Sequence, residues 1–369
     1  MQKLAIIGAS YLQMPLVQRA REKGLYTICF AWEDGAVCKS IADEFFPISI
    51  VKKELILQVC QEKRIDGICT IASDVAAPTV AYVAEHMGLV GNTYDVALRA
   101  NNKYLMRNAF VSAGVPCPKY RFVTSLSELH VGFDFPLIVK PTDRSGSLGI
   151  MKVVRQDELS SAVEKALDYS FKHEALVEEF IEGREISVEF ISYKGEHFPL
   201  QITDKVTTEA PHFVELEHHQ PANLNQEQYE EIFGLTQKAL DALGVTNGAS
   251  HSEYKITSEG KVIMMEIGAR MGGDFIGSDL VYLSTGYDYL GGVIDIALDQ
   301  FERPIFGGYH YSGVYFLCED TKYLKDIIKK KDIPQIVRAE ITSDCLQRVT
   351  CSAERSGYLI YQSDKKLVL

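Results

Sequence analysis

The first hundred residues alternate between short apolar runs and amphipathic segments, and this alternation limits the fold more than any other feature of the chain. The apolar runs have the length of strands: 3–9 (KLAIIGA), 26–32 (YTICFAW) and 66–73 (DGICTIAS). The segments that follow them show the apolar spacing of helices: 15–24, 51–64 and 78–88. Strands that alternate with helices form βαβ units and a parallel sheet. The sequence therefore predicts an α/β domain over residues 1–100.

The turn after the first strand, GASYLQMP, lies where dinucleotide-binding domains carry their phosphate loop. That loop needs the pattern G-x-G-x-x-G, and this turn has a single glycine. We therefore do not expect a nicotinamide or flavin cofactor.

Composition narrows the class of partner. The chain has 369 residues, 46% of them hydrophobic, which suits two or three packed domains. Its formal net charge of −12 argues against nucleic acid or an anionic membrane as the main partner. No apolar run approaches the roughly 20 residues that span a bilayer, and the chain opens on a strand rather than a signal peptide. The 8 Cys include no CxxC pair, as is typical of reduced thiols in a cytoplasmic protein.

Beyond residue 100 the pattern changes to strands that follow one another more directly. A helix over 101–114 precedes them, and an amphipathic helix over 225–244 divides them. The expected strands are 135–141, 149–154, 175–181, 184–192, 196–206, 251–257 and 261–267. A long helix should then run to Phe301, before short strands and one Lys-rich helix. The predicted divisions are 1–100, 101–302 with a lid subdomain at roughly 115–182, and 303–369.

Two glutamates stand out in the hairpin formed by HSEYKIT and KVIMMEI. Pairing Thr257 with Val262 across the short turn places Glu253 opposite Glu266. Directly opposed side chains have Cβ atoms about 5 Å apart, so the two carboxylates repel each other unless a cation binds between them. Mg²⁺ bound to a nucleotide takes one or two carboxylates and completes its shell with water. Two solvated glutamates are the alternative, but the following Arg270 and its neighbouring glycines suit the approach of an anion.

Two lysines and a loop of small residues indicate a phosphate site. Lys140 ends the apolar strand FPLIVK, and Lys103 opens the helix NKYLMRNAF. The loop TDRSGSLG offers backbone N–H groups around Gly146 and the hydroxyls of Ser145 and Ser147. It is not a Walker A loop, because it runs from strand to strand and lacks GK[ST]. Each feature taken singly is more often a surface lysine or a hairpin connection, so the prediction depends on their combination.

In their order along the chain these segments resemble the ATP-grasp superfamily over roughly residues 3–301. The order is Lys103, FPLIVKP with Lys140, SGSLG, ALVEEFIEGREISVEF, Glu253 and MEIGARMGG. The resemblance implies a Rossmann-like pre-ATP-grasp domain followed by an ATP-grasp fold, with α/β and α+β character. It also implies ATP and Mg²⁺ (or Mn²⁺) as bound species.

The resemblance further implies which residues bind the nucleotide. They are Lys103 and Lys140 at the phosphates, Ser145, Gly146 and Ser147 in the covering loop, the backbone of Glu178, Glu179, Phe180 and Ile181 at the adenine, and Glu185 at the ribose.

Other matched positions bear on the chemistry. Glu253 and Glu266 match the metal ligands, and Arg270 matches the arginine beside the transferred phosphoryl group, with Lys140 as the second catalytic residue. The family's usual Asn, two residues after the second glutamate, is Gly268 here. This departure leaves the number of metal ions open. The loop also has fewer glycines than carboxylase members show.

Within the superfamily, TDKVTTEAPHFVELEHHQPANL followed by EIGARMGGDFI resembles the amino-acid ligase branch, which includes dipeptide-forming and carnosine-type synthetases. This implies an ATP-dependent carboxylate–amine ligase that works through an acyl phosphate and releases ADP and phosphate. His218 and His219 are candidates for facing the substrate, although a surface pair is the more common arrangement. Asp74, at the carboxyl end of a predicted parallel strand, is a candidate for a substrate ammonium or for a helix cap.

Two other functions stay open at this point. One is a bicarbonate-activating enzyme like biotin carboxylase or carbamoyl-phosphate synthase, which the sparse loop glycines disfavour. The other is a non-catalytic nucleotide-binding protein, which the presence of both lysines and both glutamates disfavours. The expected partners are small-molecule carboxylates and amines, with neither nucleic acid nor membrane. A homodimer is compatible with the sequence, which does not fix the oligomeric state.

Overall fold

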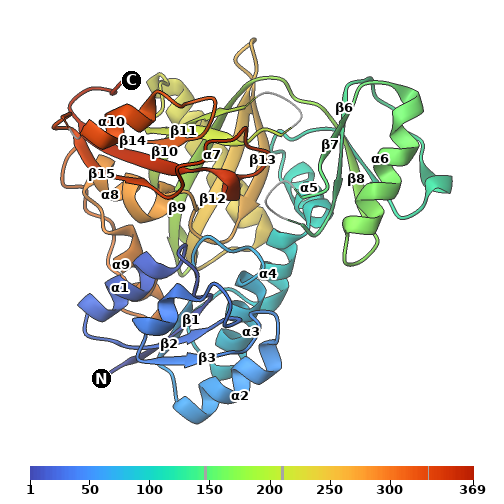
Figure 1. Cartoon of the computed structure of the whole chain (residues 1–369). Helices are drawn as coiled ribbons and strands as arrows, with labels where there is room; N and C mark the ends of the chain where they lie inside the picture. The colour runs from blue at the N-terminus through green and yellow to red at the C-terminus, as the bar shows by residue number, and fades with distance from the viewer. Residues whose placement is uncertain (145–147, 209–211, 331) are drawn as a thin grey trace.

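The computed structural model describes residues 1–144, 148–208, 212–330 and 332–369, and three sheets lie within these ranges (Figure 1). The first is a parallel sheet of order β3-β2-β1-β4 near the N-terminus. Its strands are Lys3–Ile7 (β1), Tyr26–Phe30 (β2), Glu44–Phe46 (β3) and Gly67–Cys69 (β4). The helices of this part are Met14–Glu22 (α1), Lys53–Lys63 (α2), Ala77–Met87 (α3) and Tyr94–Asn101 (α4). The predicted α/β architecture is confirmed.

Strand β1 lies inside this sheet because both of its faces are apolar. Leu4 and Ile6 pack against α1, while Ala5 and Ile7 pack toward α2 and α3. Such a continuous apolar run is what a parallel strand needs when helices cover both faces. The sequence does not predict β3, which has only three residues and lies at the edge of the sheet.

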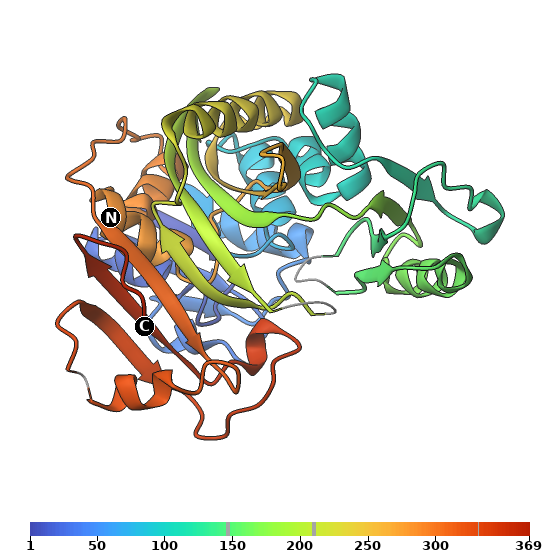
Figure 2. The ribbon, with the colours of Figure 1, turned by 90° about the horizontal axis from the view of Figure 1, so that it is seen from above.

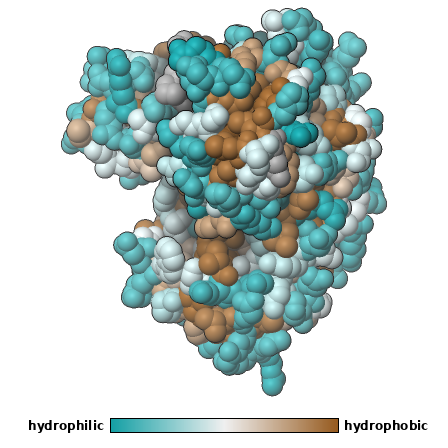
Figure 3. All heavy atoms as spheres, turned by 90° about the vertical axis from the view of Figure 1, so that its right-hand side faces the viewer, coloured by the Kyte–Doolittle hydropathy of each residue, from teal (hydrophilic) through white to brown (hydrophobic). Residues whose placement is uncertain are grey.

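The second sheet, of order β5-β8-β6-β7, forms a lid that projects to the right in Figure 1. Helix Lys103–Ser112 (α5) leads into it, and helix Gln156–Tyr169 (α6) covers it through an apolar face that packs on the strands. Its strands are Tyr120–Val123 (β5), Leu137–Pro141 (β6), Met151–Val153 (β7) and Ala175–Glu179 (β8). On the side of the molecule that carries the lid, polar residues dominate and apolar ones gather in small patches (Figure 3).

The third sheet is the centre of the molecule and has the order β13-β12-β9-β10-β11-β14-β16-β15. Its strands are Arg184–Tyr193 (β9), Glu196–Thr207 (β10), Glu215–Gln220 (β11), Gly248–Ile256 (β12), Val262–Gly268 (β13), Tyr311–Leu317 (β14), Ile336–Ile341 (β15) and Gly357–Ser363 (β16). Helix Gln226–Leu243 (α7) lies along one face, with the lid at one end of the molecule and the C-terminal strands at the other (Figure 2). Strands β14, β16 and β15, which follow residue 302, continue this sheet. The sheet itself therefore does not mark the boundary expected near residue 302, and that boundary stays a prediction.

The two faces of the central sheet differ in chemistry. On the face toward α7 and α5, apolar side chains of β9, β10, β12 and β13 form one core with those helices. On the other face, Lys205 of β10 contacts Glu185 of β9 and Glu253 of β12, and His251 of β12 contacts Glu253 and Glu189 of β9. This polar face is where the candidate site lies.

The β12–β13 hairpin places Glu253 directly opposite Glu266, as predicted, but by a different register. Ile256 rather than Thr257 pairs with Val262, and a β-bulge next to Glu253 leaves Met265 as the extra residue. The bulge restores the opposition of the two glutamates. Val262 and Met264 of β13 pack into the core with α7.

The prediction of one long helix that reaches Phe301 is wrong. The chain instead forms a π-helical turn (Ile276–Leu280), then helices Val281–Thr285 (α8) and Tyr289–Ala297 (α9). The break is at Gly286, whose φ is +74° and whose added Cβ would lie 3.0 Å from backbone atoms of Gly307. The remaining elements are helix Leu324–Lys330 (α10) and short 3₁₀ turns at Val37–Ser40, Leu126–Glu128 and Ser352–Glu354. Among the described residues no helix is both long and apolar enough to cross a membrane.

Candidate active site

Lys140 is buried at the base of the lid, between residues of like and opposite charge. Its Nζ lies 2.6 Å from Glu178 Oε2 on the neighbouring strand β8, and Arg107 Nε of α5 lies 2.7 Å from Glu178 Oε1. The pKa of Lys140 is lowered by burial and by the nearby Arg107 and Lys103, against the attraction of Glu178. We call Lys103, Arg107, Lys140 and Glu178 the cationic cluster, since Glu178 contacts Lys140 and Arg107 and the charge of Lys103 acts on Lys140.

Arg107 is the least satisfied member of this cluster. It is fully buried, and its nitrogens find no hydrogen-bond geometry to any described residue, although Nε is in ion-pair contact with Glu178. Burial raises the pKa of Glu178, but Arg107 and Lys140 outweigh it and hold that pKa below its usual range. The cluster therefore keeps an excess of positive charge, which an anion would balance.

Lys103 connects the cationic cluster to the glutamate hairpin. Its Nζ donates to the backbone oxygen of Arg144 at 2.7 Å, next to the small-residue loop, and to Glu266 Oε1 at 3.1 Å. Lys103 is only 4% exposed, whereas the side chain of Glu266 is partly exposed. The structure thus brings Lys103, Lys140 and Glu266 together, although they come from separate motifs.

A second buried lysine, Lys205 of β10, lies on the polar face of the central sheet. Its Nζ is 2.8 Å from Glu185 Oε1, 2.8 Å from Glu253 Oε1 and 3.6 Å from Glu215 Oε1. Burial alone would lower the pKa of Lys205, but the three carboxylates outweigh it and hold this pKa well above its usual value. We call Lys205, Glu185, Glu215 and Glu253 the anionic cluster. Sequence reasoning misses Lys205; its signal is a lysine within the otherwise buried strand QITDKV.

His251 of β12 borders the anionic cluster and was also missed. Its Nδ1 is hydrogen-bonded to the fully buried Glu189, and its Nε2 lies 3.4 Å from Glu253 Oε1. Although burial lowers it, the Glu189 carboxylate raises the pKa of His251 to about 9, so the ring is a cation at neutral pH. Glu189 also accepts a hydrogen bond from the backbone N–H of Gly272 at 3.2 Å. A Cβ at Gly272 would lie 2.7 Å from His251 Nδ1, which explains the glycine.

Arg270, just beyond β13, forms a two-point ion pair with Asp74 of the first domain. Nε lies 2.8 Å from Oδ1, and Nη2 lies 2.9 Å from Oδ2. Burial raises the pKa of Asp74, but Arg270 outweighs it and holds that pKa below its usual range. Both carboxylate oxygens of Asp74 are thus engaged by Arg270, and α3 has no side-chain cap, so a contact to a substrate ammonium stays a prediction.

Comparisons with known proteins bear on the family and the fold. Residues 133–279 match the family model described as the ATP-grasp domain. The alanine–anticapsin ligase of Bacillus subtilis (strain 168) is 30% identical over 245 residues, which cover 60% of this chain and 51% of that protein. This chain contains an ATP-grasp domain. The chain thus spans about half the length of that relative, so its own activity is a separate question.

Solved structures show the same fold over nearly the whole of this chain. The L-amino acid ligase from Bacillus licheniformis has a TM-score of 0.83 at 24% identity, covering 99% of this chain and 94% of that one. The biotin carboxylase domain of the 2-oxoglutarate carboxylase from Hydrogenobacter thermophilus has a TM-score of 0.77 at 20% identity, covering 98% and 86%. Both similarities establish the fold, and neither decides the substrate.

The segment expected to read the adenine edge runs from the end of β8 out of the lid. Glu178 directs its carboxylate into the cationic cluster. Glu179 accepts a hydrogen bond from the backbone N–H of Lys119, and the backbone N–H of Phe180 donates to Pro136. The lid strands therefore fix the start of this segment. Ile181 follows it directly.

Glu185, the expected ribose contact, is held on the polar face by two lysines. Oε1 contacts Lys205, and Oε2 lies 2.9 Å from Lys255 Nζ. It shares Lys205 with Glu253, which places the expected ribose residue and one expected metal ligand in one cluster.

The two histidines of β11 point to opposite faces of the sheet. His218 is paired with Lys205 on the polar face, but it is buried, and burial lowers its pKa well below the usual value. Its ring nitrogens lack a hydrogen-bond partner among the described residues. His219 faces away, with hydrogen bonds to Tyr361 and Glu217. The structure therefore does not bring His219 to the other site residues.

Three expected phosphate contacts, Ser145, Gly146 and Ser147, lie outside the described residues. Their role stays a prediction.

Proposed function

We propose that this protein is an ATP-dependent carboxylate–amine ligase that forms an acyl phosphate and releases ADP and phosphate. One observation carries the proposal: a buried cluster with excess positive charge is bonded through Lys103 to Glu266, which pairs across the hairpin with Glu253 of the cluster with excess negative charge. A metal–nucleotide complex carries both charges in one ligand, and Arg270 lies at the end of the same hairpin.

On the nucleotide side, Lys140 and Lys103 hold the phosphates, with Ser145, Gly146 and Ser147 as the covering loop. Phosphate oxygens would provide the acceptors that the excess cations lack. The backbone of Glu178, Glu179, Phe180 and Ile181 binds the adenine, and Glu185 binds the ribose. The alanine–anticapsin ligase similarity supports this assignment of an ATP-consuming ligase.

Glu253 and Glu266 are the proposed ligands for Mg²⁺ or Mn²⁺. Hard oxygen donors in directly opposed positions fit such an ion, and both carboxylates already attract a cation, Lys205 in one case and Lys103 in the other. Among the described residues no set of three or more His, Cys, Asp or Glu forms a metal site, so phosphate oxygens and water would complete the shell. When bound, the ion supplies charge neutralisation at the β- and γ-phosphates.

The chemistry proposed for the chain's own residues follows from charge. A substrate carboxylate oxygen attacks the γ-phosphorus, ADP leaves, and Lys140 stays on the phosphate oxygens. The amine then attacks the acyl carbon, phosphate leaves, and the nitrogen gives up a proton. Arg270 donates hydrogen bonds to the oxyanion that develops in this second step. In these steps Asp74 acts only by holding Arg270. The geometry supports no role for His218 or His219.

The test is a coupled measurement of ADP and phosphate with pairs drawn from a panel of amino acids and other small carboxylates and amines. Turnover should require ATP, Mg²⁺, a carboxylate and an amine together. Release of AMP and pyrophosphate would contradict the acyl-phosphate route. Bicarbonate-dependent turnover without an organic carboxylate would establish the carboxylase-type alternative, and nucleotide binding without any turnover would establish a non-catalytic protein.

A further inference from the structure

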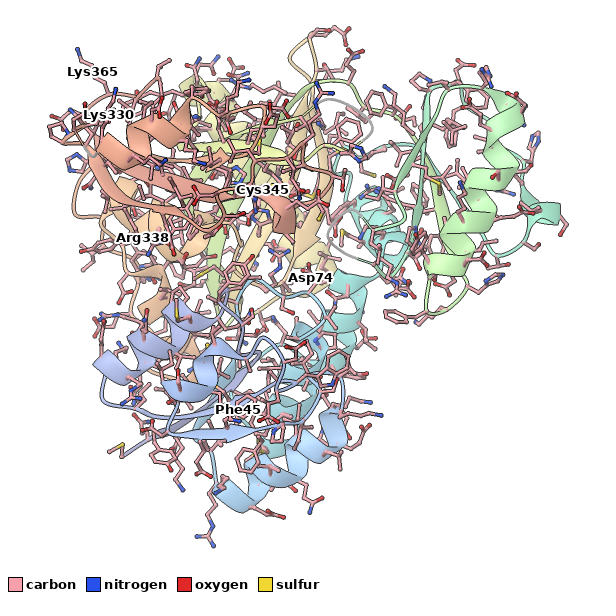
Figure 4. All side chains as sticks on the ribbon, in the orientation of Figure 1. Phe45, Asp74, Lys330, Arg338, Cys345 and Lys365 are labelled. Carbon is pink, nitrogen blue, oxygen red and sulfur yellow. The ribbon has the colours of Figure 1, made fainter. Side chains whose placement is uncertain are left out.

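The Asp74–Arg270 ion pair joins the first domain to the end of β13, and its two residues are 196 positions apart in the sequence. Asp74 follows β4 of the first domain, and Figure 4 shows it where that domain meets the central sheet. The two carboxylate oxygens bind Nε and Nη2 of Arg270 in the planar two-point geometry that is specific to Arg with a carboxylate. Such a pair fixes the plane of the guanidinium as well as its position.

The loop that carries Asp74 is itself held against the end of β13. The backbone N–H of Ala72 donates to Met271 O at 3.1 Å, and Asn101 Nδ2 donates to the backbone oxygen of Asp74. Ala72 has a φ of +55°, a conformation that costs energy for a residue with a side chain. The loop thus accepts local strain while keeping Asp74 beside Arg270.

Gly268 leaves the space that this ion pair occupies. A Cβ at residue 268 would lie 2.9 Å from Asp74 Oδ1 and 3.3 Å from Arg270 Cζ. The φ of Gly268 is not in the left-handed region, so the backbone does not call for glycine there. Any side chain at this position would compete with Asp74 for the same place.

Arg270 keeps part of its hydrogen-bonding capacity. Asp74 takes one N–H from Nε and one from Nη2, and Met271 O accepts from Nη1 at 3.2 Å. A guanidinium has five N–H groups, so one on each terminal nitrogen is not used by these bonds. These two N–H groups are left for a bound anion.

We propose that Asp74 is the positioning residue for Arg270, and that Gly268 is required because it leaves room for their ion pair. This inference rests on the proposed ligase function. It means that the first domain contributes to the rate of the chemical step by orienting an arginine of the ATP-grasp domain. It also accounts for the glycine that stands where the sequence departs from the family pattern.

The first variant is Asp74→Asn, which keeps the shape of the side chain and removes its charge. We expect kcat to fall by about tenfold to 100-fold, the range seen when an orienting partner is lost, with little change in the KM for ATP. Combined with Arg270→Lys, which cannot form the two-point pair, Asp74→Asn should add almost no further loss. A role in packing alone would give additive losses and would not separate kcat from KM.

The matched control is Asp288→Asn. Asp288 forms the other Arg–Asp pair that links the first domain to the ATP-grasp domain, with Arg19 Nε and Nη2 at 2.8 and 2.7 Å from Oδ2. This pair is more than one-third exposed and lies away from Arg270, and Asn can still cap α9. The kcat of the Asp288→Asn variant should equal that of the wild type.

A second variant, Gly268→Ala, tests the space itself. It should lower kcat as Asp74→Asn does, and the two changes together should give no more than the larger single loss. The thermal shift caused by Mg·ADP shows whether each variant is folded and binds nucleotide.

An unchanged kcat in Asp74→Asn, additive losses with Arg270→Lys, or an equal loss in Asp288→Asn would overturn the inference. A wild type that forms no ADP with any substrate pair would instead overturn the proposed function, and the inference with it.

Discussion

Lys140 and Lys205 are both buried strand lysines, yet they lie in surroundings of opposite charge. Lys140 shares the single carboxylate of Glu178 with Arg107, whereas Lys205 alone contacts three carboxylates. Burial and neighbouring cations accordingly lower the pKa of Lys140, while the carboxylates overcome burial and hold the pKa of Lys205 well above its usual value.

The difference shows what each cluster still lacks. Excess positive charge in a poorly solvated place is balanced by an anion, and excess negative charge by a cation. Lys205 therefore acts as the internal counter-ion of its cluster, while Lys140 is available to an external phosphate. The following predictions test that contrast from either side.

The largest effect is expected for Lys205→Met. Lys205 is the buried cation that contacts three carboxylates of the anionic cluster, and Lys255 and His251 contact only one each, so its removal should lower the free energy of unfolding by about 3–5 kcal/mol. Mg²⁺ should restore part of this loss, because it would supply the missing positive charge. Urea unfolding with and without Mg²⁺ measures both effects. The control is Lys255→Met, whose ammonium contacts only Glu185 of the cluster and which should cost about 1 kcal/mol or less. Equal losses in the two variants would refute the special position of Lys205.

Glu266→Gln should act on turnover more than on stability. Loss of a proposed metal ligand should reduce Mg²⁺-dependent turnover by at least about 100-fold. The sequence alone suggests relief of a repulsion between Glu253 and Glu266, but Lys103 and Lys205 already offset that repulsion. The metal-free protein should therefore unfold within about 1 kcal/mol of the wild type. Glu259→Gln, at the exposed turn of the same hairpin, is the control. Turnover that stays at the level of this control would remove Glu266 from the site.

The smallest effect is expected for Lys140→Met, in nucleotide affinity. Loss of a charge-assisted contact should weaken ATP binding by about tenfold or more. Stability should fall less than in Lys205→Met, because Arg107 still compensates Glu178. Calorimetric titration compares this variant with Lys119→Met, an exposed lysine 3.6 Å from Glu179 at the edge of the lid. Unchanged affinity in a folded Lys140→Met protein would show that the cationic cluster does not bind phosphate.

The parts that could be predicted from sequence depend on short-range patterns. The α/β start, the long amphipathic helix α7 and the opposition of Glu253 and Glu266 all follow from residues close together in the chain. Even there, the β-bulge that leaves Met265 unpaired was not visible, because a bulge changes register without a distinctive residue.

The parts that were missed depend on pairing between distant strands. Lys205 meets Glu185 and Glu253 because β9 lies between β10 and β12, and that order cannot be read from spacing. The bond from Asp74 to Arg270 has the same character, since it links two domains. Sequence periodicity reports which residues are buried, but not which buried charges compensate one another.

The most direct test of the two-cluster account is the binding of ADP measured by calorimetry with EDTA and again with Mg²⁺, for wild type, Lys140→Met and Glu266→Gln. The account predicts that Lys140→Met binds ADP weakly under both conditions. Glu266→Gln should bind ADP like the wild type in EDTA and should lose the gain in affinity that Mg²⁺ gives the wild type. If both variants lost the same affinity in EDTA and kept the same gain with Mg²⁺, the division into an anion-binding and a cation-binding cluster would be wrong.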